Sequence, residues 1–140
     1  QFGWHMVEHA GDYNRKDWQP AASARRFECG SPNLLCAHAL DASLSLLLEV
    51  GMHNVSQQLA ARVAHLHDGL LARGMTLLSP ADPNRRAGIV TFRSPREDSD
   101  TLFRRLREQN VVCAPRGGGI RLSPHFYTSD AVIDRVLALL

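Results

Sequence analysis

An arginine near the C-terminal end of the sequence is placed where it could bind a carboxylate. Arg121 follows three successive glycines at positions 117–119 and lies within the alternating stretch 120–123. This alternation predicts a short strand with Ile120 and Leu122 on one face and Arg121 on the opposite face. A guanidinium held on a strand just beyond a glycine turn suits two-point binding of a carboxylate. An ordinary solvated arginine beside a glycine-rich hairpin loop explains the same spacing, so the pattern by itself leaves both interpretations open.

The cysteines and histidines form no second chemical site that their spacing can identify. Cys29, Cys36 and His38 lack the intervals of a structural zinc site, and no further pair of ligands follows at a recognisable distance. We therefore expect no metal. His65 and His67 lie in a helical stretch with no nucleophile–base–acid arrangement around them. They are interpreted as solvated or capping residues, and hydrolase chemistry has little support.

The arginines are numerous, but their surroundings do not indicate nucleic-acid binding. The net charge is +2, and Lys16 is the only lysine. The basic cluster at 104–107 is interleaved with acidic residues, which is typical of a charged outer helix face. No apolar run approaches the roughly 20 residues needed to span a bilayer. We therefore expect neither a nucleic-acid partner nor a membrane.

Composition indicates an ordinary globular domain. The chain has 140 residues, of which 44% are hydrophobic and 21% charged, and this length suits one compact domain. Three cysteines, an odd number without a C-x-x-C pair, favour a reduced, cytoplasmic setting. The first residue is Gln1 rather than Met, which leads us to expect a fragment of something longer.

The predicted elements follow the order helix, helix, strand, strand, helix, strand, strand, helix. Apolar residues at three- and four-residue steps predict helices over 34–50 and 54–73, which Gly51 and Gly74 terminate. Two further helices begin at the capping residues Ser99 and Ser129. Strands are predicted in four short β-branched or alternating stretches, 75–79, 88–93, 111–114 and 120–123. The expected fold is α+β: a small, mainly antiparallel sheet of three or four strands with helices packed on one face.

Residues 1–24 show no sustained period but are rich in large aromatic side chains. Phe2, Trp4 and Trp18 are scattered among Gly, Asp, Asn and Pro residues. So many apolar rings in a loop-like segment should pack against something. They either cover this domain's own core or lie against a part of the protein outside this chain, and in the second case Phe2, Trp4 and Trp18 should be exposed here.

Three segments, taken in order, resemble the class V aminotransferases, a family of pyridoxal-phosphate enzymes. Residues 26–33 match the pattern R-F-E-x-G-S/T-P-N, and residues 88–92 resemble the family's G-I-V-S/T-F strand. Residues 121–129 resemble the pattern R-V/L/A-S-x-x-x-Y-N-T, with Thr128 and Ser129 in place of Asn-Thr. The match covers about 25–140. The family includes cysteine desulfurases, kynureninases and isopenicillin N epimerase-like enzymes.

The resemblance implies a fold type I enzyme with pyridoxal phosphate as cofactor, an amino-acid substrate and a homodimer. Residues 1–33 would come from the large-domain or linker region, and 34–140 would be the C-terminal small domain. The arginine that matches Arg121 grips the substrate α-carboxylate in this family. The segment that matches Gly30 and Ser31 binds the cofactor, the Ser31 hydroxyl reaching its phosphate, commonly in the neighbouring subunit.

Two departures from the family pattern limit these expectations. Lys16 lies too close to Arg26 to match the lysine that holds the cofactor, so the large domain with that lysine is missing. The chain alone should therefore carry no cofactor and be inactive. Desulfurases also place a reactive cysteine on the loop before the arginine, whereas this sequence has the short segment 116–119 there, with Cys113 in the preceding strand. A transaminase, epimerase-like or kynureninase-like activity is favoured over a desulfurase.

A second class of function stays open on the residues alone. The chain could be a free-standing α+β module in which the glycine loop and Arg121 bind a carboxylate, or which dimerises, without catalysis.

Overall fold

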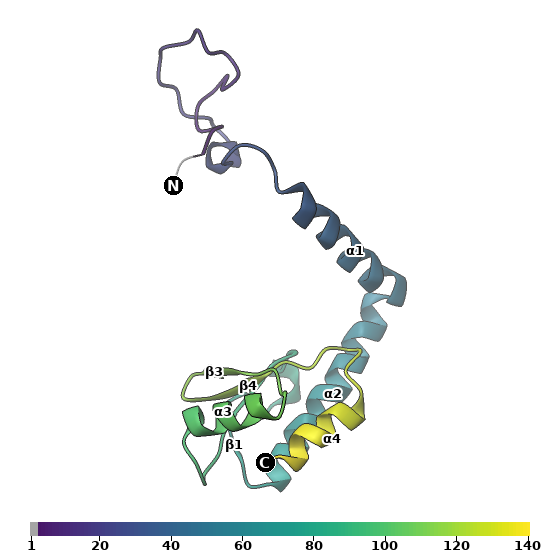
Figure 1. Ribbon diagram of the computed structural model, residues 1–140. Helices are drawn as coiled ribbons and strands as arrows, with labels where there is room; N and C mark the ends of the chain where they lie inside the picture. The colour runs from purple at the N-terminus through teal and green to yellow at the C-terminus, as the bar shows by residue number, and fades with distance from the viewer. Residues whose placement is uncertain (1–2) are drawn as a thin grey trace. The chain divides into compact units, whose positions relative to one another are not determined.

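The computed structural model describes residues 3–140, which form two compact units that divide after Leu46 (Figure 1). Helix α1 (Leu34–Val50) begins in the first unit and ends in the second. The predicted domain boundary, between positions 33 and 34, is the start of this helix. That 1–33 come from a larger domain stays a prediction.

The first unit is built from loops that hold each other through backbone hydrogen bonds. Gly3 N donates to Arg26 O at 3.3 Å, and His5 N donates to Glu28 O at 3.2 Å. A Cβ on Gly3 would lie 1.9 Å from Glu28 O, so only glycine permits this approach. The segment beginning at Gly3 therefore runs directly beside the 3-10 helix η1 (Ala24–Phe27) and the residue that follows it.

The aromatic side chains of the first unit are exposed, as expected if their partner lies outside this chain. Trp4 is 57% exposed and Trp18 is 61% exposed. Phe2, for which we make the same prediction, lies outside the described residues. Trp4 and Trp18 therefore do not pack into a core of the first unit.

Helix α1 matches its predicted range but buries none of its side chains. Its start is capped by Asn33, whose Oδ1 accepts a hydrogen bond from Cys36 N at 3.1 Å, and Gly51 at φ 83° ends it. Leucines stand exposed around it, among them Leu35 and Leu48. A helix that is apolar all round is normally buried, so this surface lacks its cover within the chain. Among residues 3–140, no single helix is long and apolar enough to cross a membrane; α1 and the next helix, α2 (Met52–Ala72), have that length and composition only when taken together across the bend at Gly51.

The second unit has the predicted α+β fold. Its sheet consists of β1 (Thr76–Leu77), β2 (Val90–Arg93), β4 (Gly119–Leu122) and β3 (Ala114–Arg116), in that spatial order, and all neighbours are antiparallel. Its helices are α2 (Met52–Ala72), α3 (Ser99–Glu108) and α4 (Asp130–Ala138), with α4 beside α2 in Figure 1. The third strand was predicted at 111–114 but lies at Ala114–Arg116. The hairpin turn after Arg116 decides which residues can pair with β4, so the strand lies next to that turn.

One face of the sheet forms the core with these three helices. Phe92 and Ile120 are fully buried there, together with leucines such as Leu70 and Leu106. This confirms that helices cover a single face of an antiparallel sheet.

The histidine interpretation is wrong for His67, which is 4% exposed and pairs through Nδ1 with Asp68 Oδ1 at 3.1 Å. Its position on α2 turns towards the core, which the apolar spacing of the helix could have indicated. His65 instead joins α2 to α4, because its Nε2 lies 2.7 Å from Asp134 Oδ1.

The three successive glycines serve two different purposes. Gly117 and Gly118, at φ 58° and 76°, form a two-residue hairpin turn that needs the left-handed region. Gly119 is needed for space, because a Cβ there would lie 2.3 Å from Phe92 O in the neighbouring strand. The turn sets the register of β3 against β4, and the missing side chain lets β4 pack beside β2.

Replacing Gly119 with Ala should therefore lower the free energy of unfolding by about 1–3 kcal/mol, because a backbone oxygen cannot move aside cheaply. Gly117→Asn is the matched control. It should cost less than about 1 kcal/mol, since Asn tolerates the left-handed region of this turn type. Urea unfolding of both variants checks this, and equal losses would contradict the distinction between turn and contact.

Candidate functional site

Arg121 lies on the central strand β4, on the face of the sheet away from the helices. Its pairing partners are Thr91 in β2 and Ala114 in β3. Its neighbours Ile120 and Leu122 are 0% and 6% exposed and face the core, so strand alternation directs Arg121 to the open face. This is the face that the sequence predicted.

Arg121 as a whole residue is half-buried, and its guanidinium has no ion-pair partner among residues 3–140. Some other arginines in the same unit are engaged: Arg62 pairs with Asp130 at 3.0 Å, and Arg105 pairs with Glu97 and donates to Leu139 O. An arginine with both edges of its fork free can still bind a carboxylate through two parallel hydrogen bonds.

The hairpin that leads into Arg121 is fastened to helix α3. Ser99 Oγ donates to Gly118 O at 3.0 Å. Asp98 caps this helix by accepting hydrogen bonds from Asp100 N and Thr101 N, at 3.0 and 2.9 Å. Hydrogen bonds from Thr101 hold the pKa of the Asp98 carboxyl below its usual value. The turn before Arg121 is thus anchored to the first turn of a helix.

The chain after Arg121 is held by a local turn and by ring stacking. His125 N donates to Thr128 Oγ1 at 2.9 Å, and the rings of His125 and Tyr127 stack with centroids 4.5 Å apart. Ser129 Oγ then accepts from Val132 N at 3.4 Å at the start of α4, which confirms Ser129 as a capping residue. The segments at both ends of β4 are therefore held in place, so Arg121 lies on a rigid strand.

Gly30 and Ser31 lie in the first unit, at an open cavity of about 440 Å³. Gly30 adopts φ 130°, a conformation that side-chain-bearing residues rarely take. Among the described residues, no hydrogen-bond partner is found for the Ser31 hydroxyl or for the backbone N–H groups of Gly30 and Ser31. Free hydroxyl and N–H donors at a glycine turn suit an anion with several oxygens, such as a phosphate.

The structure adds Trp4 and His5 to this cavity, which is also lined by Cys29 and Pro32. His5 Nδ1 is buried without a hydrogen bond, 3.6 Å from Glu28 Oε2. We did not predict either residue as part of a site. The many aromatic rings near the N-terminus predicted that this segment packs against something. The backbone pairing of the Gly3 segment with residues 26–28 is what brings Trp4 and His5 to the cavity at Gly30 and Ser31.

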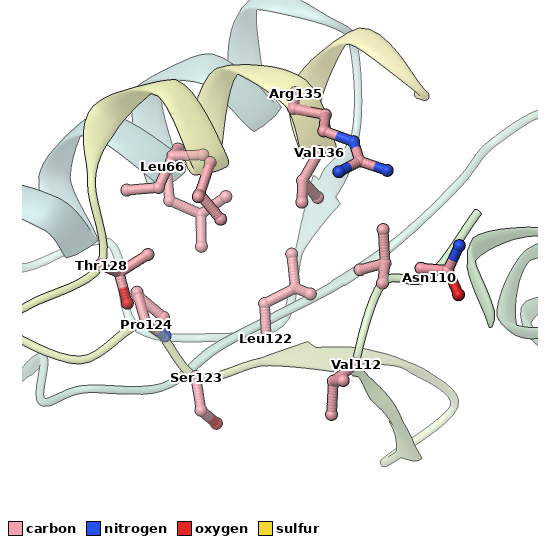
Figure 2. A pocket seen from close by; sticks show the side chains of 12 residues that line it. Leu66, Asn110, Val112, Leu122, Ser123, Pro124, Thr128, Arg135 and Val136 are labelled. Atoms are coloured by element: carbon pink, nitrogen blue, oxygen red, sulfur yellow. The ribbon is translucent and has the colours of Figure 1, made fainter.

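A second cavity, of about 310 Å³, opens beside the end of β4 and is shown in Figure 2. Its walls are mostly apolar, with Leu122 and Leu66 among them, and Ser123 and Thr128 contribute hydroxyl groups. Arg135 lines the cavity and donates to Gln109 O at 3.3 Å. None of the predicted site residues lines it.

Cys113 lies immediately before β3 and is half-buried against the core. Burial raises the pKa of its thiol above the ordinary value, with Arg107 opposing this more weakly. A raised pKa leaves less thiolate at neutral pH, which is the opposite of what a reactive cysteine needs.

The sequence of the chain matches the family described as Aminotransferase class-V over residues 1–132. The chain belongs to the class V aminotransferase family. The aminotransferase YcbU of Bacillus subtilis (strain 168) is 32% identical over 122 residues, which are 84% of this chain and 32% of that protein. Isopenicillin N epimerase of Streptomyces clavuligerus is 32% identical over 120 residues, 80% of this chain and 30% of that protein. The chain thus spans about a third of the length of the curated relatives it matches.

Solved structures of other proteins share the fold. The apo cysteine desulfurase from Thermococcus onnurineus NA1 superposes with a TM-score of 0.81 at 21% identity, over 98% of this chain and 37% of that one. A C-DES mutant with glycine covalently linked to its PLP cofactor superposes with a TM-score of 0.78 at 22% identity, over 98% and 36%. At these identities the likeness establishes the fold of this aminotransferase-family chain and nothing finer.

The burial of Cys113 leads to a prediction about thiol reactivity. Alkylation by iodoacetamide, followed with mass spectrometry across a pH series, should show a higher midpoint pH for Cys113 in the folded chain than in the urea-unfolded chain. The midpoint, unlike the rate, does not depend on how easily the reagent reaches the sulfur. A midpoint for Cys113 that is equal or lower in the folded chain would contradict the raised pKa.

Proposed function

We propose that this chain is the C-terminal part of a pyridoxal-phosphate enzyme acting on an amino acid, in which Arg121 binds the substrate carboxylate. Membership of the class V aminotransferase family supports a pyridoxal-phosphate enzyme. The observation that carries the role of Arg121 is its half-buried position on the inner strand β4, with a guanidinium free of any acidic partner in residues 3–140. An enzyme that binds a substrate carboxylate needs a guanidinium that is not already paired with an acidic residue.

Gly30 and Ser31 would hold the cofactor phosphate. Their free N–H and hydroxyl donors fit a phosphate, and the positive φ of Gly30 lets the backbone turn towards it. We further propose that this phosphate belongs to the cofactor of a neighbouring subunit in a homodimer. The exposed Trp4 and Trp18 and the uncovered helix α1 support a larger assembly around this segment.

Pyridoxal phosphate, when bound, acts as an electron sink for bonds at the substrate α-carbon. The residues of this chain would orient the amino acid for that chemistry, and a lysine outside the chain would hold the cofactor. Lys16 does not suit that task, because it is exposed and its Nζ lies 3.5 Å from Tyr13 O in a surface loop. The chain alone would therefore be inactive, and the whole protein would be cytoplasmic.

The reaction proposed is a transamination, epimerisation or kynureninase-like cleavage rather than desulfuration. The two-residue turn Gly117–Gly118 carries no cysteine, and burial raises the pKa of Cys113. Relatives with the names aminotransferase and isopenicillin N epimerase support the same choice. The similar solved structures include a cysteine desulfurase, so desulfuration is the competing activity to be tested.

The full-length protein that contains this chain tests the class of function. Its visible spectrum should show the absorbance of bound pyridoxal phosphate, and amino acids that are substrates should shift that band. Absence of any such band would favour a carboxylate-binding or dimerising module without catalysis. Sulfide release from cysteine would favour the desulfurase.

Arg121→Gln in the full-length enzyme should raise the KM for the amino acid about 100-fold or more, because two charge-assisted hydrogen bonds are lost and each 1.4 kcal/mol is worth tenfold. Arg121→Lys should recover only part of this, since an ammonium cannot make the parallel pair. Cofactor occupancy, read from the visible band, should not change. An unaltered KM in both variants would remove Arg121 from the site.

Ser31→Ala should weaken the affinity for pyridoxal phosphate about tenfold, because a hydrogen bond to a charged phosphate is worth about 1.5–3 kcal/mol. Ser31→Thr keeps the hydroxyl and is the matched control, with affinity close to the parent. The measurement is a titration of the full-length apoenzyme with cofactor. If the Ala and Thr variants bind the cofactor equally well, Ser31 does not hold the phosphate.

A further inference from the structure

We propose that Arg93 and Arg116 form a second anion site next to Arg121, which makes the enzyme selective for amino acids with an acidic side chain. This inference rests on the proposed function of Arg121 and adds the substrate class. The site lies on the open face of the sheet, on strands β2 and β3 that flank β4.

The strand register puts the three arginines on the same face. Phe92 pairs with Ile120, and both are fully buried on the core face. The next residue in β2, Arg93, therefore turns to the open face and comes opposite Gly119. Arg116 pairs directly with Gly119 from the other side. Arg93 and Arg116 are both exposed and lie diagonally across from Arg121 on either side of β4.

Charge on this face is unbalanced. Arg93, Arg116 and Arg121 are the only charged residues in the four strands. Among the described residues, none of the three forms an ion pair. Like charges on neighbouring strands repel each other, and one ligand with two separate negative groups would relieve that repulsion. A single carboxylate on Arg121 would leave the other two arginines uncompensated.

The surface between the arginines suits a short hydrocarbon spacer. Diagonal neighbours on adjacent strands are about 7–8 Å apart, within the combined reach of two arginine side chains and a small dicarboxylate. Gly119 has no side chain of its own, and the space above this buried glycine is filled by Leu78. Leu78 lies over it, with Cδ1 2.9 Å from the position of a Cβ on Gly119. Methylene groups between two carboxylates would contact Leu78 while each carboxylate meets a guanidinium.

The test compares binding of glutarate and butyrate to the full-length holoenzyme by calorimetry. Each probe has a chain of three hydrocarbon carbons, but glutarate carries two carboxylates and butyrate carries one. The parent should bind glutarate about tenfold or more tightly than butyrate. Arg93→Gln with Arg116→Gln should abolish that preference and leave butyrate within about twofold. Arg107→Gln, an exposed arginine on α3, is the control for the loss of charge and should keep the preference.

The outcomes separate this inference from the proposed function. A parent enzyme without preference for glutarate, or a preference that survives in the double variant, overturns the second anion site. Arg121→Gln should weaken both probes. If it weakens neither, the carboxylate role of Arg121 fails, whatever the double variant does. A loss of preference in Arg107→Gln as large as in the double variant would show a general charge effect and would also overturn the site.

Discussion

The antiparallel pairing of β4 with β2 on one side and β3 on the other is the constraint on which the second unit depends. Because side chains alternate along a strand, this pairing buries Ile120 and Leu122 and at the same time places Arg121 on the opposite face. A slip of one residue would exchange the two faces and place a guanidinium in the core. Core packing and the position of the candidate binding residue are therefore enforced by the same contacts.

The glycines at 117–119 make this register possible. Two of them satisfy a turn that needs positive φ, and the third allows β4 to approach β2 closely. Ser99 anchors the turn to α3, and the stacked rings of His125 and Tyr127 stiffen the exit from the strand. A residue that binds substrate by geometry gains from such supports, because misplacement by a small distance weakens a bidentate contact.

Several surface features of the two units are consistent with a chain that spans about a third of the length of its curated relatives. Helix α1 has apolar residues around its circumference and no buried side chain, and Trp4 and Trp18 are exposed. The cavity at Gly30 and Ser31 is open, and no described residue accepts from its N–H and hydroxyl donors. The exposed helix and tryptophans are apolar surfaces that water solvates poorly.

Most of the fold could be predicted from the sequence because its signals are local. The predicted cap at Ser129 and the stops at Gly51 and Gly74 lie where the structure has helix ends, whereas Asp98 rather than the predicted Ser99 caps α3. The third strand was misplaced, since its pairing depends on the turn that follows it rather than on its own residues. The burial of His67 was also missed, because a polar residue was assumed to face water although its position on α2 faces the core.

The sequence by itself determined the family, the α+β class and the face of the strand that carries Arg121, because motifs, capping residues and alternation are written in neighbouring positions. Only the tertiary structure decided which distant residues meet. Strand register brought Arg93 and Arg116 to Arg121, and backbone pairing brought Trp4 and His5 to Ser31. These proximities depend on contacts between segments tens of residues apart, which no local pattern specifies.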